Sequence, residues 1–264
     1  MYEEYWGLKE KPIENTPDPR FFYRSPQHEE ALGRLLYVVR EGKGAGMLTG
    51  VFGCGKTVLG RTLLKELEND VYKIGFITNP RLETTELLRM ILHSLGRKNL
   101  PERKTEVLVA LNELLVDNIR DGKKTILIID EAHTIEEKGV FEEIRLLLNY
   151  QLENKFLLTL LLFGQPGLTE EIESNKPLLQ RIAIRYNLNP LSLEETKKYV
   201  YHRLAIAAGD GSGLFDLKSL EKIYQYSGGI PRRINQICDM CLLIGFDKKK
   251  EKIDEEIIKE AMQV

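Results

Sequence analysis

The sequence has no apolar run of membrane length and no signal peptide at its start. Its longest apolar run, residues 156–163, has the length of a strand, well short of the roughly 20 residues that span a bilayer. Residues 1–6 are acidic and aromatic, whereas a signal peptide begins with basic residues and continues with apolar ones. The chain has only three cysteines. So few cysteines fit a protein of the reducing cytoplasm.

Net charge is also nearly absent. The formal charge is −2 and the isoelectric point is about 6.2, so no overall basic field indicates nucleic-acid binding, although a local patch stays possible. The sequence contains no internal repeats and no low-complexity tracts. Its 264 residues and 42% hydrophobic content suit one large globular domain, or a core domain with a smaller one.

What the sequence does contain is a phosphate-binding loop. Residues 50–57 read GVFGCGKT and fit the pattern G-x-x-x-x-G-K-[ST], between an apolar segment of strand length and a helical pattern over 58–67. Glycines let the backbone wrap closely around phosphate, and the N-terminus of the next helix favours an anion. We therefore predict that ATP contacts Gly50, Val51, Phe52, Gly53, Cys54, Gly55, Lys56, Thr57 and Val58. Lys56 would reach the β- and γ-phosphates, and Thr57 would hold Mg²⁺.

A second motif carries the chemistry of hydrolysis. The apolar, β-branched run 125–129 predicts a strand buried on both faces, and it ends at Asp130 and Glu131. Carboxylates in this position point into the crevice where α/β proteins bind ligands. We expect Asp130 to support Mg²⁺ and Glu131 to orient and deprotonate the attacking water. The alternative is a helix N-cap followed by a first-turn acid, but the P-loop favours the metal and the water.

The remaining pattern predicts a parallel α/β sheet followed by helices. Apolar runs predict about five strands, at 45–49, 71–78, 125–129, 156–163 and 184–188, with helices beginning at Pro26 and covering 58–67, 84–95, 102–120 and 140–152. Beyond residue 190 every signal is helical, with a capping box over 192–195, N-caps at Asp216 and Asp254, and Pro231 at a helix start. We thus predict an extended segment, 1–24, packing on an α/β nucleotide-binding core, 25–190, and a helical lid, 191–264.

Two stretches have open interpretations. Pro17 and Pro19 exclude a helix in the aromatic N-terminal segment, which either only packs on the core or also covers the adenine ring. Cys238 and Cys241 form a C-x-x-C inside a helical pattern. A structural zinc site needs four ligands and Cys54 belongs to the P-loop, so a core helix face is favoured over metal or redox chemistry.

This combination of core, motifs and lid resembles the AAA+ ATPases. Gln165 follows the fourth strand, where that family places its polar sensor 1. Arg181 resembles the arginine finger that reaches a neighbouring subunit's γ-phosphate, with Arg185 as the alternate finger. The sequence GGIPRR over 228–233 resembles the sensor 2 motif, which implies that Arg232 contacts the nucleotide. The alternative for each arginine taken alone is an ordinary surface charge.

Within the AAA+ ATPases the chain resembles the general secretion pathway protein A (ExeA/GspA) family over nearly its whole length. The shared motifs are Tyr5-x-Gly7, Lys11-Pro12, TPDPRFFY over 16–23, SPxHxEAL over 25–32, GCGKT over 53–57, Gly164-Gln165-Pro166 and SGGIPR over 227–232. That family's ATPase domain is cytoplasmic, is often followed by a membrane span and a periplasmic peptidoglycan-binding part, and helps a secretin to assemble. No span follows here, so we expect a soluble relative or an excised domain, with a position peripheral to the inner membrane. Ile13 and His133 depart from the family pattern, which has Phe and more often Gln there.

The resemblance implies an ATPase that binds and hydrolyses Mg-ATP to drive assembly or remodelling of a partner. Its expected partners are further copies of itself, in a ring or filament with shared ATP sites, and secretion-system membrane proteins. The alternative is a DNA-binding AAA+ regulator of the TniB/TnsC transposition type. The letters DEAH at 130–133 also occur in helicases, but those need two recombinase-like domains and this chain has room for one. A non-enzymatic nucleotide-binding scaffold is disfavoured because Glu131 is present.

Overall fold

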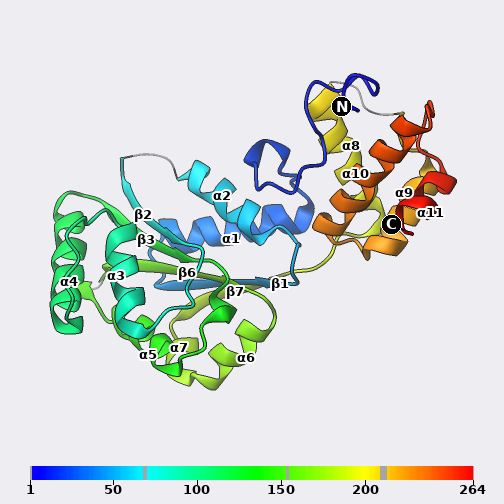
Figure 1. Ribbon diagram of the computed structural model, residues 1–264. Coiled ribbons are helices and arrows are strands. Elements are labelled where there is room, and N and C mark those ends of the chain that lie inside the picture. The colour runs from blue at the N-terminus through cyan, green and yellow to red at the C-terminus, as the bar shows by residue number, and fades with distance from the viewer. Residues whose placement is uncertain (1, 68–69, 153–154, 209–212, 264) are drawn as a thin grey trace. The chain divides into compact units, whose positions relative to one another are not determined.

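The computed structural model describes residues 2–67, 70–152, 155–208 and 213–263. The chain divides into two compact units (Figure 1). The α/β unit comprises Glu29–Val51 and Leu59–Leu188, and the helical unit comprises Met1–His28, Phe52–Val58 and Asn189–Val264.

The α/β unit is built on a five-stranded sheet with the order β2-β3-β6-β1-β7. Its strands are β1 (Ala45–Gly50), β2 (Tyr72–Ile77), β3 (Lys124–Ile129), β6 (Leu158–Gly164) and β7 (Ile182–Leu188). Every neighbouring pair is parallel, as predicted. All residues of β1 and β6 are buried, which explains why their sequences are continuous apolar runs without alternation.

Helices cover both faces of this sheet (Figure 1). One face carries α1 (Pro26–Arg40) and α2 (Lys56–Glu66), while the other carries α3 (Thr84–Ser94), α4 (Lys104–Arg120), α5 (Lys138–Leu147), α6 (Gly167–Ser174) and α7 (Lys176–Leu179). Alternate residues of each strand serve the two faces. Met47 and Leu127 join the cluster under α3 to α7, whereas Phe163 lies so close to Gly60 of α2 that a Cβ there would be 2.8 Å from its ring.

One predicted helix and one predicted strand have wrong boundaries. We predicted a helix to residue 152 and a strand over 156–163, but α5 ends at Leu147 and Leu158 begins β6. Between them β4 (Gln151–Leu152) and β5 (Lys155–Phe156) pair as a small antiparallel ribbon. The Leu157 amide donates to the Tyr150 carbonyl over 2.9 Å, so the apolar run is divided between two sheets. Hydrophobicity alone marks no boundary inside such a run.

The helical unit contains α8 (Leu193–Ala208), α9 (Leu217–Ser227), α10 (Pro231–Asp247) and α11 (Glu255–Ala261). The predicted capping box precedes α8: the Ser192 amide donates to Glu195 Oε2 over 2.9 Å, and the Glu195 amide donates to Ser192 Oγ over 3.3 Å. Asp216 and Asp254 accept first-turn amides of α9 and α11, which confirms both predicted N-caps. Among the described residues, no helix is both long enough and apolar enough to cross a bilayer.

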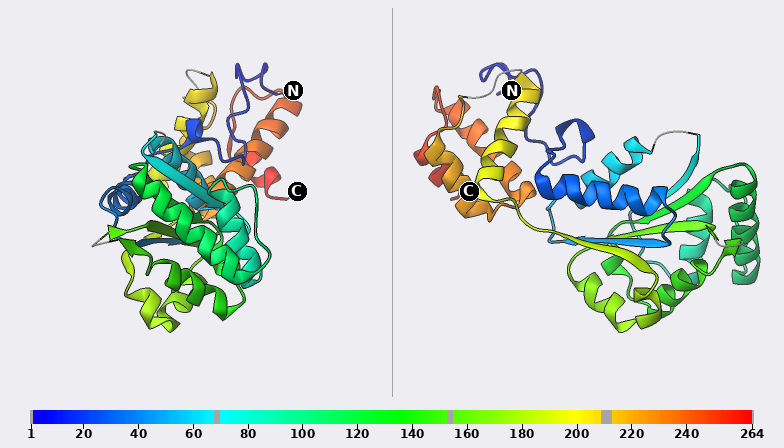
Figure 2. Two further views of the ribbon diagram at one scale, coloured as in Figure 1. Left: turned by 90° about the vertical axis from the view of Figure 1, so that its left-hand side faces the viewer. Right: turned by 180° about the vertical axis from the view of Figure 1, so that it is seen from behind.

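The N-terminal segment contributes to the core of the helical unit, although we predicted it as a cover for the α/β core. Tyr2, Trp6, Leu8, Ile13 and Phe21 are buried in one hydrophobic cluster with residues of α8 to α11. Figure 2 shows the segment beside α8. Arg203 of α8 is also buried, and it donates to the backbone carbonyls of Pro12 (2.7 Å) and Glu14 (2.8 Å). Four helices bury little surface by themselves, so the aromatic segment enlarges their core.

Candidate nucleotide site

Two glycines determine the backbone shape of the P-loop. Gly53 and Gly55 have φ angles of +87° and +97°, in the region that favours glycine. Cys54 between them is buried, and Lys56, which is 4% exposed, opens α2. The loop therefore offers a turn of backbone amides followed by a helix N-terminus, an arrangement that binds anions.

Within the helical unit, His28 contacts this loop. Its Nε2 lies 3.0 Å from the Cys54 carbonyl oxygen and its Nδ1 lies 2.7 Å from Ser25 Oγ. The imidazole is buried, and desolvation lowers the pKa of His28 below its usual value. No local pattern in the sequence predicts this contact, because the partners are 26 residues apart.

Arg232 contacts the same loop from the start of α10. Its backbone amide donates to the Gly53 carbonyl over 3.3 Å. Its guanidinium carbon lies 4.2 Å from the centre of the Phe52 ring, which is a cation–π contact. Phe52 itself is 54% exposed. A Cβ on Gly53 would lie 2.8 Å from Arg232 Cβ, so only glycine allows this approach. The predicted sensor 2 arginine and the P-loop thus belong to one compact unit.

The acid turn, residues 130–134, follows β3 in the α/β unit. Asp130 is buried, and its Oδ1 accepts the backbone amide of Glu131 over 2.9 Å. Glu131 has a left-handed backbone with φ +53°, which is unusual for a residue other than glycine. Thr134 Oγ1 donates to the Glu131 carbonyl over 2.8 Å and closes the short helix η2 (Ala132–Thr134). Strained residues of this kind cluster at functional sites.

His133 joins the acid turn to the end of β6. Its Nδ1 accepts the Gln165 backbone amide over 3.3 Å, and its Nε2 lies 3.5 Å from Glu131 Oε2. Because Nδ1 accepts a hydrogen bond, the proton of the neutral ring is on Nε2 and faces the carboxylate. The structure therefore brings together two predicted residues, Glu131 and Gln165, through a histidine that the sequence marked only as a departure from the family pattern.

Glu131 also lines a polar cleft within the α/β unit. This cleft has a volume of about 360 Å³ and is lined by Thr78, Asn79, Arg81, Glu131, His133, Thr134 and Glu136. It lies where β2 and β3 end, which is the edge of a parallel sheet at which ligands bind. Arg81 and Glu136 form an exposed ion pair of 2.7 Å at its rim. A water molecule can therefore reach the Glu131 carboxylate from solvent.

The two motifs leave the sheet at the same edge. β1 leads into the P-loop and β3 leads into the acid turn, and both strands pair in parallel with β6. Thr49 aligns with Gly164, and Ile129 aligns with Leu162. Gln165 follows β6, so the central three strands all end in predicted site residues.

Arg181 lies at the opposite edge. It immediately precedes β7, whose first residue, Ile182, aligns with Ala45 at the start of β1. A strand of six residues spans about 20 Å, which separates Arg181 from the strand ends that carry the site motifs. Arg181 Nη2 donates to Asn149 Oδ1 over 2.8 Å, whereas Arg185, midway along β7, pairs with Glu173 over 3.1 Å.

Cys238 and Cys241 lie on the core face of α10, as the helical pattern indicated. Both are buried in the hydrophobic cluster of the helical unit and form no disulfide. Burial raises the pKa of the Cys241 thiol to about 12 and that of Cys238 well above its usual value. Neither sulfur is therefore a thiolate near neutral pH.

Known proteins resemble the chain both in sequence and in fold. A family described as AAA domain matches residues 39–172. General secretion pathway protein A from Aeromonas hydrophila is 38% identical over 259 residues, which cover 96% of this chain and 46% of that protein. The chain thus spans less than half the length of this relative.

Two solved structures share the fold at low sequence identity. The ORC2 protein of Aeropyrum pernix in its ADPNP–ADP complexes aligns over 97% of this chain and 72% of its own, with a TM-score of 0.71 and 18% identity. The ORC1 protein of the same organism in complex with DNA aligns over 96% and 70%, with a TM-score of 0.71 and 18% identity. The family match over residues 39–172 and the 38% identity across nearly the whole chain show that it belongs to the AAA+ ATPases and resembles general secretion pathway protein A.

Proposed function

We propose that the chain binds and hydrolyses Mg-ATP. The observation that carries this proposal lies within the α/β unit. The strand that leads into the P-loop and the strand that ends at Asp130 are parallel members of one sheet and end at the same edge. This is the edge at which parallel α/β sheets bind their ligands.

Each predicted residue has a definite task in this proposal. The amides of the P-loop and Lys56 bind the phosphates, while the Thr57 hydroxyl and the Asp130 carboxylate would hold Mg²⁺. Mg²⁺ held by these two residues would neutralise the negative charge of the phosphates. Glu131 orients a water molecule from the adjoining cleft and takes its proton. Gln165 and Arg232 contact the nucleotide as the two sensors.

We further propose that the active form is a homo-oligomer in which Arg181 serves the site of a neighbouring subunit. Arg181 lies at the amino-terminal edge of the sheet, so it is poorly placed for the nucleotide of its own subunit. Its side chain donates to the neutral amide of Asn149, whereas Arg185 is engaged by the carboxylate of Glu173. An amide holds a guanidinium less strongly than a carboxylate does, which favours Arg181 as the finger.

The experiment that tests this function measures phosphate release from Mg-ATP at increasing protein concentration. Specific activity should rise with concentration, and Arg181→Ala should bind ATP but release phosphate about 10³-fold more slowly or worse. Mixing Arg181→Ala with Lys56→Ala should restore activity, because a mixed oligomer contains an intact site beside an intact Arg181. No phosphate release by the wild type excludes the ATPase, and concentration-independent activity without recovery excludes only the shared site. Recovery with Arg185→Ala instead would move the finger to Arg185.

The work done with this energy is proposed to be assembly or remodelling of a secretion-system component at the cytoplasmic side of the inner membrane. The resemblance to general secretion pathway protein A supports this assignment. Membrane proteins of a secretion system would be the partners, and the chain would act as a peripheral ATPase.

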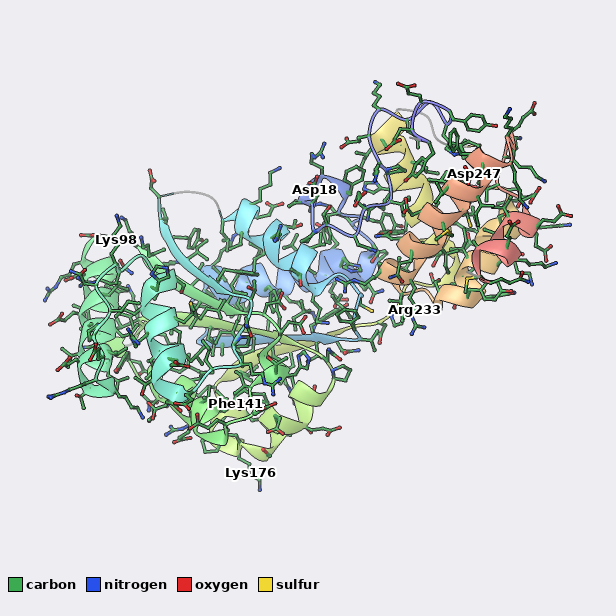
Figure 3. All side chains as sticks on the ribbon, in the orientation of Figure 1. Asp18, Lys98, Phe141, Lys176, Arg233 and Asp247 are labelled. Atoms are coloured by element: carbon green, nitrogen blue, oxygen red, sulfur yellow. The ribbon has the colours of Figure 1, made fainter. Side chains whose placement is uncertain are left out.

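A DNA-binding AAA+ regulator of the TniB/TnsC type is the second candidate, and a basic loop favours it. The α3–α4 connection carries Arg97, Lys98 and Arg103 against the single carboxylate of Glu102, and Lys104 follows as the first residue of α4. Arg97, Lys98 and Arg103 are exposed, and Figure 3 shows Lys98 at the surface. Lys104 is engaged by Glu143 at 2.5 Å. Exposed cations of this kind attract phosphate backbones.

Duplex DNA distinguishes the two candidates. Under the second candidate, DNA should stimulate ATP turnover at low salt, the stimulation should fade as salt rises, and Arg97→Glu with Lys98→Glu should remove it. A rate that is the same with and without DNA leaves the secretion role as the proposed function.

A further inference from the structure

The side chain of His28 connects the first turn of α1 to the P-loop, and both belong to the helical unit. Its Nε2 lies 3.0 Å from the Cys54 carbonyl oxygen, and its Nδ1 lies 2.7 Å from Ser25 Oγ. The His28 side chain is buried, and its ring meets the Phe22 ring edge to face with centroids 5.7 Å apart. The imidazole is therefore fixed on two sides by groups outside the loop that it contacts.

The hydrogen-bond partners settle which ring nitrogen carries the proton. A carbonyl oxygen only accepts, so Nε2 must donate to Cys54. Nδ1 then accepts from the Ser25 hydroxyl, whose oxygen also accepts the His28 backbone amide over 3.4 Å as the N-cap of α1. Ser25 thus serves both as the helix cap and as the hydroxyl that donates to Nδ1.

The Cys54 carbonyl shares a peptide plane with the Gly55 amide. The described residues contain no cis peptide bond, and in a trans peptide the C=O and N–H point in opposite directions. The bond to His28 therefore turns the Gly55 N–H away from the imidazole. The ring also fills the space beside Gly55, since a Cβ there would lie 3.2 Å from Nε2. Gly55, with φ +97°, has no Cβ, so the peptide plane between Cys54 and Gly55 can rotate readily about the single bonds on either side of it. The hydrogen bond from His28 restricts this rotation.

We propose that His28 is a positioning residue for nucleotide binding: its Nε2–H holds the Cys54 carbonyl so that the Gly55 amide faces the phosphate. This inference rests on the proposed function, because it assigns His28 a part in the same P-loop. His28 touches no phosphate itself. It lowers the cost of ordering the loop when a nucleoside diphosphate or triphosphate binds, since the peptide is already oriented.

Two amide substitutions separate this role from packing. The Nε2 of glutamine reaches the position of histidine Nε2, whereas the shorter asparagine reaches only the position of Nδ1. His28→Gln should keep the donor to Cys54 and bind Mg-ADP like the wild type. His28→Asn and His28→Phe lose that donor and should bind Mg-ADP about three- to tenfold more weakly, the range expected for one hydrogen bond. Isothermal titration calorimetry with Mg-ADP measures this without relying on turnover.

A second histidine supplies the matched control. His202 lies in the same unit, and burial lowers its pKa as well. His202→Phe should lower the melting temperature without changing the affinity for Mg-ADP. Should His28→Asn fail to fold, His28→Phe, which keeps a ring against Phe22, provides the comparison with His28→Gln.

The outcomes are distinct. Weak binding by the Asn and Phe variants with rescue by Gln supports the proposal. Equal affinity of all His28 variants, or equal weakening by Gln and Asn, overturns it while leaving the nucleotide site intact. If the wild type itself fails to bind Mg-ADP, the proposed function falls and the role of His28 falls with it.

Discussion

The P-loop and the acid turn obtain their shapes in opposite ways. The P-loop is contacted by side chains far away in sequence, His28 from α1 and Arg232 from α10. The acid turn is closed by neighbours, since Asp130 accepts the Glu131 amide and Thr134 donates to the Glu131 carbonyl. Positive φ angles fall on glycines in the first case and on a glutamate in the second.

We expect this difference to decide what a substitution at each motif changes. Glycine adopts a left-handed backbone without strain, so the P-loop needs outside contacts only to choose one of several allowed shapes. A left-handed glutamate costs about 1 kcal/mol or more, and its surroundings must maintain it. We therefore expect changes around the P-loop to alter nucleotide affinity, and changes around the acid turn to alter turnover.

The largest expected effect is on binding. Lys56→Ala removes the cation that we propose binds the phosphates, so ATP should no longer raise the melting temperature. The stabilisation by a bound ligand depends on the ratio of its concentration to its dissociation constant. Thermal denaturation with and without Mg-ATP measures this. A variant that ATP stabilises as strongly as the wild type would show that Lys56 is not in the nucleotide site.

The next effect is on turnover alone. Glu131→Gln keeps the size and hydrogen bonding of the side chain but cannot accept the proton of water, so kcat should fall by about 10² to 10⁴. ATP should still raise its melting temperature as in the wild type. Wild-type turnover in this variant would remove Glu131 from the role of base, and loss of ATP binding would contradict the separation of the two motifs.

A smaller effect is expected at His133. His133→Leu keeps volume but loses both polar contacts, so kcat should fall about tenfold with KM unchanged, while His133→Gln retains a donor and an acceptor and should recover most of the rate. In a Glu131→Gln background, His133→Leu should have no further effect on the residual rate. Additive losses in the double variant would mean that His133 acts independently of Glu131.

The smallest effect concerns pH. Desolvation lowers the pKa values of His28 and His202 in the folded chain below the usual 6.5. As pH falls below that value, the unfolded chain binds more protons than the folded one, so the free energy of unfolding decreases. The melting temperature should therefore fall between pH 7 and 5 more steeply in the wild type than in a His28→Gln, His202→Phe double variant. Equal slopes would contradict the burial effect.

The sequence predicted the elements that local chemistry determines. The sheet strands follow from apolar runs, and the caps of α8, α9 and α11 follow from one or two side chains each. The division of the apolar run at 156–163 was missed because it depends on a carbonyl of Tyr150, which hydrophobicity does not show. The burial of segment 1–24 against α8 to α11 was missed for a related reason, because aromatic composition predicts burial but not the helices that provide it.

The candidate site likewise contains residues that the sequence predicted and residues that it did not. The P-loop and the pair Asp130–Glu131 could be predicted because their residue types and spacing indicate a function by themselves. The roles assigned to them stay predictions for the experiments above. The contacts of His28 and His133 had no such signal, since each depends on a backbone group brought near by the fold. The family resemblance singled out His28 and His133 but identified no hydrogen-bond partner for either of them.

Trp6 gives the chain a built-in optical reporter. It is the single tryptophan of the sequence, it is buried, and its Nε1 donates to the Leu242 carbonyl over 2.9 Å. An indole in this setting emits at shorter wavelength than one in water, so its emission maximum records whether the N-terminal segment remains docked on α10. The same signal can be followed in stopped flow during nucleotide binding, with no attached dye.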